Sequence, residues 1–272
     1  MWVASWHKLL GETNFDVRRH YHRCPAARIH RQYDDDMPLS DLSTNAQDYL
    51  KAIWNAQEWS TAPVTTSWLA DRMSVRPSTV SDTIKRLSEQ GLVEHAPYGS
   101  IELTGVGRKH AVEMVRRHRL IETFLVKALD YGWDEVHEES EHLEHAVSET
   151  MIERMDAYLG HPTRDPHGDP IPSADGRPHR PKAIQLTAVA DDKVRVERVS
   201  DSDPGMLRYF AEKGLVPGAQ VTIVKCEPFA DALTVSVEGS KGTFALGTLA
   251  SDAIWVTAGR STTSPADSPI GP

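Results

Sequence analysis

Cysteine is scarce in this chain, which has two cysteines, Cys24 and Cys226, among 272 residues. Two cysteines are too few for a disulfide framework, and this scarcity indicates a reducing, cytoplasmic setting. Long apolar runs are also lacking, because no stretch approaches the roughly 20 apolar residues that a membrane span needs. The first residues show no apolar run of signal-peptide length and no small-residue cleavage pattern, so we expect neither a secretory signal nor a membrane partner.

Positive charge is in deficit, and the formal net charge is −9 with 25% charged side chains. This balance excludes a protein that coats nucleic acid by bulk electrostatics, but not a reader of one defined DNA sequence. The acidic residues are concentrated between Trp133 and Asp156, a segment that contains nine carboxylates and a single arginine. A solvated acidic surface is one interpretation of such a run. The three histidines in it, His137, His142 and His145, favour a second interpretation as a metal site.

The chain is long enough for about two domains or more. Residues 1–36 show no helical or strand periodicity. We expect them to be a disordered extension, or the product of a start codon placed upstream of a true start at Met37, with a DNA-contacting basic arm as the alternative. Residues 259–272 are rich in Ser, Thr and Pro, and we expect a disordered tail there.

Residues 37–106 have the pattern of a winged helix-turn-helix. Ser43-Thr44 is a helix-capping pair before AQDYLKAIWNAQEW, and VTTSWLADRM predicts a second, shorter helix. After the turn SVRP, Ser78 is expected to cap a third helix, STVSDTIKRLSEQ, which is polar at its N-terminal end like a recognition helix. LVEHAPYGSIELTGVG then predicts a β-hairpin wing.

The rest of the chain predicts two further domains and completes an α+β fold. Residues 107–160 carry long apolar stripes at helical spacing, including Val136, Leu143, Val147 and Met151 on one acidic helix, which favour a helical dimerisation domain. Residues 161–182 form a proline-rich linker. Residues 183–258 alternate short strands with Gly and Pro and contain one helix at MLRYFAEKG, which predicts a small SH3-like β-barrel.

The segment VHEESEHLEHAVSETM carries the clearest chemical signal. On a single helix, His137, Glu141, Glu144 and His145 would share an arc of about 100° beside the apolar stripe. Carboxylates and imidazoles at the edge of a buried face are costly unless a cation neutralises them, and a divalent ion does so directly. A salt-bridged surface patch is the alternative. His118 and Glu122, four residues apart on the preceding helix, are a second candidate pair, although such pairs are common on helix surfaces.

The chain resembles the DtxR/MntR family of metal-dependent repressors. The likeness runs from about Leu39 to Val256 and rests on TNAQDYLKAIW, RPSTVSDTIKRLSEQGLV, RRHRLIE, VHEESEHLEH and DPHGDPIP. It implies a winged helix, a helical dimerisation domain and a C-terminal barrel similar to SH3 and FeoA modules. It also implies a main regulatory metal site on Asp48, Glu141, Glu144 and His145, and an ancillary site on His118, Glu122 and His137. In iron-type members the barrel completes the ancillary site, and the loop 200–203 (Ser-Asp-Ser-Asp) is the matching place here.

The resemblance also bears on the choice of metal. Iron-type members have Met and Cys where this chain has Asp48 and Glu141, and two carboxylates make a harder, oxygen-rich site that suits Mn(II). Manganese-type members often have a carboxylate where this chain has Lys51. That difference favours two separated metal sites over one closely spaced two-metal cluster.

We therefore predict a Mn(II)-dependent transcriptional repressor that binds a palindromic double-stranded DNA operator as a homodimer and controls manganese homeostasis genes. An Fe(II)-responsive repressor of iron uptake genes is the alternative. The ion would join the helix of Asp48 to the dimer core and so set the spacing of the two recognition helices. We expect DNA contacts from Arg76, Ser78, Thr79, Ser81, Asp82, Lys85 and Arg86. Asp82 either accepts from a cytosine amino group or caps the helix.

Two other function classes compete with a repressor. A hydrolase would use the Glu/His cluster to activate water, but the sequence has no nucleophile motif, no Gly-rich phosphate loop and no HExxH. A metal-buffering or adaptor protein would explain the FeoA-like barrel, but it leaves the recognition helix unexplained. We therefore expect that this protein is not an enzyme.

Overall fold

The computed structural model describes residues 38–95, 99–173, 182–190, 192–227 and 231–258. The extension expected over residues 1–36, with the proposed start at Met37, and the tail expected over residues 259–272 lie outside the described residues. Among the described residues, no helix combines the length and the hydropathy that a bilayer crossing needs.

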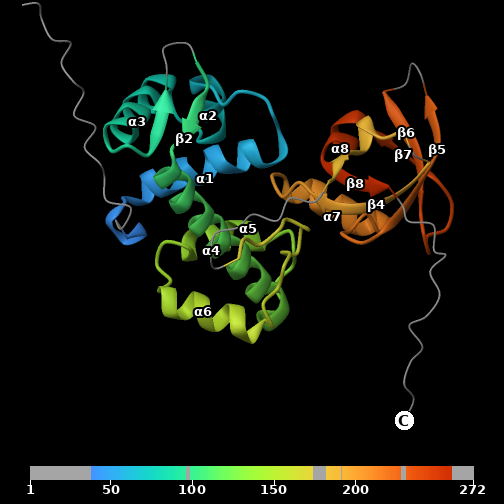
Figure 1. Ribbon diagram of the computed structural model, residues 1–272. Coiled ribbons are helices and arrows are strands. Elements are labelled where there is room, and N and C mark those ends of the chain that lie inside the picture. The colour runs from blue at the N-terminus through green and yellow to red at the C-terminus, as the bar shows by residue number, and fades with distance from the viewer. Residues whose placement is uncertain (1–37, 96–98, 174–181, 191, 228–230, 259–272) are drawn as a thin grey trace, which may run out of the picture. The chain divides into compact units, whose positions relative to one another are not determined.

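The N-terminal domain is a winged helix-turn-helix, as predicted (Figure 1). A short 3-10 helix η1 (Leu39–Asp41) precedes α1 (Thr44–Trp59), α2 (Thr66–Arg72) and α3 (Pro77–Glu89). The wing pairs β1 (Val93–His95) with β2 (Ile101–Leu103) in antiparallel register. The side chain of Ser43 caps α1 and that of Thr65 caps α2. The expected cap at Ser78 is wrong, because α3 begins at Pro77 with Arg76 as its N-cap, and proline is favoured in the first turn since it needs no amide partner there.

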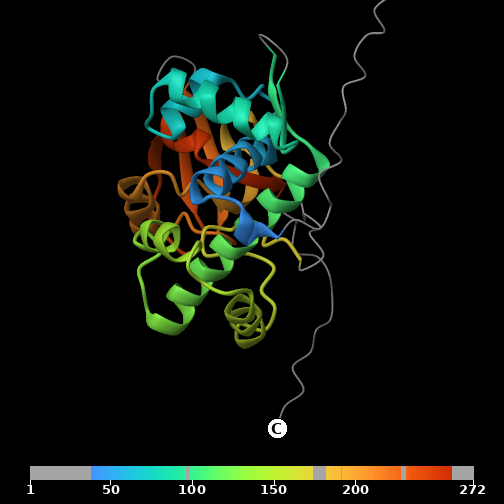
Figure 2. The same cartoon turned by 90° about the vertical axis from the view of Figure 1, so that its left-hand side faces the viewer.

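The long helix α4 (Gly105–Leu129) belongs to two hydrophobic cores. Its first half contributes Ala111, Met114 and Val115 to the core of the DNA-binding domain, and α1 packs along it (Figure 2). Its second half contributes residues such as Leu120 and Ile121 to a separate core with the helices that follow. The helix that carries Asp48 is therefore attached by apolar packing to the helix that carries His118 and Glu122.

The acidic segment forms two helices, so the prediction of a single helix through His137 and Met151 is wrong. Helix α5 (Val136–Leu143) ends at Glu144, and α6 (Glu149–Tyr158) begins after Ser148, whose hydroxyl accepts from the amide of Met151. A serine that caps a new helix interrupts the old one, because its backbone is extended there. Met151 is consequently exposed rather than part of a buried stripe.

The first part of the proline-rich segment, which includes residues 165–169, packs against the helical domain. Asp165, His167 and Asp169 are buried, and the backbone of His167 accepts from the amide of Val199 in the barrel. Gly168 makes this approach possible: its φ is +94°, and a Cβ there would lie 2.1 Å from the carbonyl oxygen of Glu197. This stretch therefore joins the helical domain to the barrel by direct contact.

The C-terminal domain is a small barrel-like antiparallel sheet, as predicted. The six strands lie in the order β3-β8-β4-β5-β6-β7 and are listed here by their bounds: β3 (Ile184–Gln185), β4 (Lys193–Val199), β5 (Gln220–Glu227), β6 (Ala232–Val237), β7 (Phe244–Gly247) and β8 (Ile254–Ala258). Helix α7 (Pro204–Lys213) covers the core through Leu207 and Phe210. Strand β3 has only two residues, because the chain turns into a 3-10 helix η2 (Leu186–Ala188) directly after it. A short helix α8 (Thr248–Asp252), which the sequence did not predict, precedes β8.

Candidate metal centre and DNA-binding surface

Three of the four residues expected in the main site come together between α1 and the turn after α5. One ligand atom each from Asp48, Glu144 and His145 lies within 4.8 Å of the others. Nε2 of His145 is 2.9 Å from Oδ1 of Asp48 and 3.5 Å from Oε1 of Glu144. Glu144 is fully buried, and burial also raises the pKa of Asp48 above its ordinary value. The group offers two carboxylates and one imidazole to a single point.

Glu141 does not join this group, because a lysine holds it. Nζ of Lys51 donates to Oε1 of Glu141 at 2.8 Å and also to Oε1 of Glu144. The ammonium is buried, but the two carboxylates outweigh the cost of burial and raise the pKa of Lys51 above its ordinary value. Lys51 therefore places a permanent positive charge between two of the expected metal ligands.

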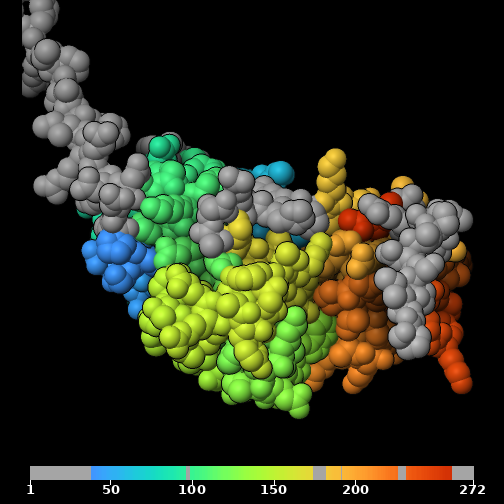
Figure 3. Space-filling view, turned by 60° about the horizontal axis from the view of Figure 1, so that its bottom comes forward, coloured from blue at the N-terminus to red at the C-terminus, as the bar shows by residue number. Residues whose placement is uncertain are grey.

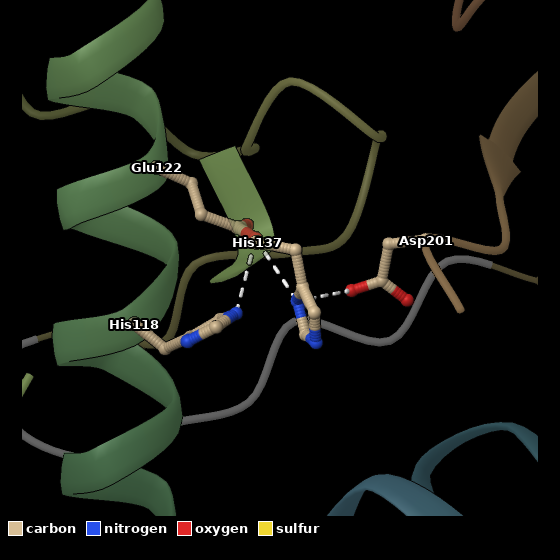
Figure 4. Close-up of side chains that lie close together, drawn as sticks. All are labelled: His118, Glu122, His137 and Asp201. Atoms are coloured by element: carbon tan, nitrogen blue, oxygen red, sulfur yellow. Dashed lines mark ion pairs between the residues drawn. The ribbon is translucent and has the colours of Figure 1, made fainter. Parts of the chain in front are cut away.

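The three residues expected in the ancillary site also come together, and the barrel adds a fourth. Figure 4 shows His118 and Glu122 on α4, His137 on α5 and Asp201 from the loop after β4 around one point. Oε1 of Glu122 is 3.0 Å from Nε2 of His118 and 3.4 Å from Nδ1 of His137. Oδ2 of Asp201 is 3.4 Å from the same Nδ1 of His137. The loop 200–203 thus supplies a carboxylate, while Asp203 instead caps α7.

The ancillary group has the features of a cation site. Both oxygens of Glu122 are buried, and no well-aligned hydrogen bond reaches them among the described residues, although Nε2 of His118 forms an ion pair with Oε1 at 3.0 Å. Oδ1 of Asp48 in the main group is orphaned in the same way despite its 2.9 Å approach to His145. Buried carboxylate oxygens without hydrogen bonds are costly, and a divalent ion with mixed nitrogen and oxygen ligands satisfies them. The residues present therefore fit a metal ion at both places.

A neighbouring carboxylate shifts the pKa of one imidazole of the ancillary group, that of His118. Burial by itself lowers the pKa of a histidine, but the Glu122 carboxylate raises the pKa of His118 to about 10. The pKa of Glu122 is correspondingly held well below its ordinary value, with His118 as the main cause that opposes burial. A cation at this point would replace the proton on His118.

A carboxylate connects the two groups. Nδ1 of His118 is 2.6 Å from Oε2 of Glu144, while Oε1 of Glu144 faces Lys51 and His145. With Nδ1 donating to Glu144, the nitrogen of His118 that faces Glu122 is Nε2. Glu144 thus belongs to the main group and also orients a member of the ancillary group.

Sequence reasoning missed a set of buried charged residues behind the ancillary group. Nε2 of His167 donates to the carbonyl of Trp133 at 2.7 Å, and its Nδ1 lies 3.6 Å from Oε2 of Glu122. Arg119 on α4 binds Glu58 of α1 through two hydrogen bonds of 2.5 and 3.1 Å. The motif DPHGDPIP, which contains His167, was the available signal in the sequence for the first contact.

The seven residues expected to contact DNA lie together on one surface. All seven are exposed, with Arg76 at the N-cap of α3 and the others along that helix. The hydroxyl of Ser81 donates to the carbonyl of Pro77, and Arg86 donates to the hydroxyl of Thr83. The apolar residues Val80, Ile84 and Leu87 face the core instead. Helix α3 therefore presents a polar surface that starts at a helix N-terminus, which suits phosphate contacts.

Comparison with known proteins matches each domain separately. The model of the iron dependent repressor N-terminal DNA binding domain matches residues 41–101, that of the metal binding and dimerisation domain matches residues 104–173, and the FeoA domain matches residues 187–258. The iron-dependent repressor IdeR of Mycobacterium leprae is 32% identical over 199 residues, which cover 68% of this chain and 86% of the relative. The chain belongs to the DtxR/IdeR family of metal-dependent repressors.

Two further proteins show the same likeness. The diphtheria toxin repressor of Corynebacterium diphtheriae is 30% identical over 171 residues, and the match covers 60% of this chain and 75% of the diphtheria toxin repressor. A solved manganese-dependent transcriptional repressor in complex with manganese is 52% identical, with a TM-score of 0.75, and the match covers 78% of this repressor and 99% of that chain. Because the family consists of DNA-binding repressors, the hydrolase and adaptor interpretations are set aside.

Proposed function

We propose that the repressor is activated by Mn(II), binds a palindromic operator as a homodimer in the cytoplasm, and controls genes of manganese homeostasis. The observation that carries the choice of metal is the main group, in which the carboxylates of Asp48 and Glu144 meet the imidazole of His145, so that these three residues offer oxygen and nitrogen donors. Hard oxygen donors favour Mn(II) over metals that prefer soft ligands. The 52% identical relative described as manganese-dependent supports the same choice.

The alternative is activation by Fe(II) and control of iron uptake genes. The similarity to iron-dependent repressors supports it, since the M. leprae relative aligns over most of its length. Imidazole and carboxylate ligands are also suitable for Fe(II). The order in which the two metals activate the repressor therefore tests the choice between them.

In this proposal the repressor holds two separated ions in each chain. The main site uses Asp48, Glu144 and His145, with Glu141 as a fourth candidate that Lys51 holds in the structure. The ancillary site uses His118, Glu122 and His137, with Asp201 added from the barrel. Bound ions supply positive charge that neutralises these carboxylates. The ammonium of Lys51 already occupies the space between Glu141 and Glu144, which supports single ions over a closely spaced pair.

The residues of the main site come from two parts of the repressor that must keep a fixed relation when it binds DNA. Asp48 belongs to α1 beside the helix-turn-helix, and Glu144 and His145 follow α5 in the dimerisation domain. Without a cation, the carboxylates of Asp48 and Glu144 repel each other. Neutralising them stabilises this arrangement and, in a dimer, fixes the distance between the two α3 helices that a palindrome requires.

We propose distinct roles for the exposed residues of α3. Arg76, Lys85 and Arg86 bind phosphates, and Ser78, Thr79, Ser81 and Asp82 face the groove, where Asp82 accepts from a cytosine amino group. Dimerisation buries the exposed apolar side chains at the end of α4 and on α6, where Leu129, Met151 and Tyr158 are 55%, 48% and 70% exposed. Helix α6 lies on the molecular surface within the yellow-green region of Figure 3.

A gel-shift titration with a selected palindromic duplex tests the proposal. We expect tight binding with Mn(II), weak binding after chelation, and a need for at least tenfold more Mn(II) in Asp48→Ala. Glu212→Ala, an exposed carboxylate of α7, is the matched control and should behave as the wild type. Equal DNA affinity of the metal-free and loaded repressor would refute the proposal. Activation by a lower free concentration of Fe(II) than of Mn(II) under anaerobic conditions would replace it by the iron alternative.

A further inference from the structure

A buried glutamine in the first turn of α1 contacts a residue of the main metal group. Gln47 is 8% exposed and directly precedes Asp48. Its Oε1 lies 2.7 Å from Nδ1 of His145, which is 98 residues away in the sequence. The family likeness assigned no role to this glutamine, so the contact needs its own explanation.

The orientation of the Gln47 amide is determined by its other contacts. Nε2 of Gln47 donates to the carbonyl of Leu39 and to the carbonyl of Leu42, each at 3.0 Å. Both partners are backbone oxygens, which only accept, so the amide nitrogen must face them. The amide oxygen therefore faces His145 as an acceptor.

This orientation decides which nitrogen of His145 carries a proton. Because Oε1 of Gln47 only accepts, Nδ1 of His145 must donate. In the neutral imidazole the lone pair is then on Nε2, the nitrogen that lies 2.9 Å from Asp48 and 3.5 Å from Glu144. A metal ligand histidine needs a free lone pair on the nitrogen that faces the ion, and its other nitrogen is commonly held by such an acceptor.

We propose that Gln47 is a positioning residue for the main metal site: it holds the His145 ring in place and keeps the proton on Nδ1, so that Nε2 is free to bind the ion. The proposal rests on the proposed function for the presence of a metal ion at the main site and for the identity of that ion. The NH₂ group of the same amide anchors η1, since Leu39 is the first residue of that 3-10 helix and Leu42 is its C-cap. Gln47 thus has one role toward His145 and a separate one toward the backbone.

Two substitutions separate these roles. Gln47→Met keeps the length of the side chain and removes both. Gln47→Glu keeps an acceptor for Nδ1 of His145 but removes the donors to Leu39 and Leu42. Both variants should lose thermal stability, whereas only Gln47→Met should lose the preference for the Nδ1 proton.

The experiment measures Mn(II) affinity by calorimetry in a His137→Ala background, which weakens the ancillary site. We expect Gln47→Met to bind Mn(II) about tenfold to a hundredfold more weakly at the main site, as loss of such a supporting hydrogen bond typically does. Gln47→Glu should stay within about threefold of the parent affinity, given the retained acceptor. If both variants lose affinity in proportion to their loss of thermal stability, the role is only structural and the proposal is wrong.

A second measurement does not depend on metal binding. Long-range ¹H–¹⁵N spectra of the metal-free repressor, recorded over a range of pH, report which ring nitrogen of His145 is protonated. We expect an Nδ1 proton in the parent and in Gln47→Glu, and a shift toward Nε2 in Gln47→Met. An Nε2 proton in the parent would overturn the proposal even if Gln47→Met fails to fold. Absence of Mn(II) binding in a parent with the Nδ1 proton would instead contradict the proposed function.

Discussion

Replacing Lys51 by methionine should destabilise the metal-free repressor and strengthen its binding of Mn(II). The ammonium contacts Glu144, which is fully buried, and Glu141, whose side chain is 37% exposed. Removing one partner of a buried ion pair typically costs about 3–5 kcal/mol, and we expect the lower end because solvent still reaches Glu141. For a chain of this size, 3 kcal/mol corresponds to a fall in melting temperature of about 6–12 °C.

The same substitution should strengthen the binding of Mn(II). In the wild type a bound ion must share Glu144 with the ammonium, whereas in Lys51→Met the carboxylate is free for it. We expect the Kd for Mn(II) at the main site to fall by tenfold or more, which is about 1.4 kcal/mol. The rise in melting temperature on adding Mn(II) should therefore be larger in the variant than in the wild type.

Thermal melts and calorimetric titrations, each with and without Mn(II), provide the assay. Lys193→Met is the matched control, because this lysine is exposed on β4, and its melting temperature should change little. The reasoning fails if metal-free Lys51→Met melts like the control, or if its affinity for Mn(II) decreases. In the first case the ammonium would not stabilise the buried carboxylates, and in the second it would assist metal binding rather than compete with it.

Three further predictions concern the ancillary site and its surroundings. Asp201→Asn should weaken Mn(II) binding at the ancillary site about tenfold to a hundredfold and leave the main site unchanged, which a two-site calorimetric titration would detect. Arg119→Met should lower the free energy of unfolding, measured in denaturant titrations, by about 3–5 kcal/mol, because it leaves Glu58 buried without its partner. A double variant that also carries Glu58→Leu should regain most of this loss. If it regains none, the ion pair between Arg119 and Glu58 is not the cause. Burial, with help from Asp169, raises the pKa of Asp165 to about 8, so that the folded protein keeps this carboxyl neutral while the unfolded chain ionises it above about pH 4. Ionising Asp165 therefore favours the unfolded chain, and the wild type loses stability as the pH rises from 4 to 8. The melting temperature of metal-free Asp165→Asn should rise relative to that of the wild type over the same interval. A difference in melting temperature that does not change with pH would contradict the raised pKa of Asp165.

Local sequence patterns predicted most elements, because helix and strand periodicity depend on neighbouring residues. The apolar spacing of α4 and the alternation in β4 are examples, and Ser43 caps α1 as expected. The same logic failed in the acidic segment. There the helical periodicity continued past Leu143, but the capping hydroxyl of Ser148 started a new helix.

By itself, the sequence determined the order of the domains, the family, and the residue types that gather at the two metal groups. Only the tertiary structure decided which of them meet: it sends Glu141 to Lys51, adds Asp201 from the barrel, and sets Gln47 against His145. The physical reason is distance along the chain. Contacts between residues about 90 positions apart depend on how α1, α4 and α5 pack, and the charge of a single buried lysine then redirects the carboxylates that are close enough to reach it.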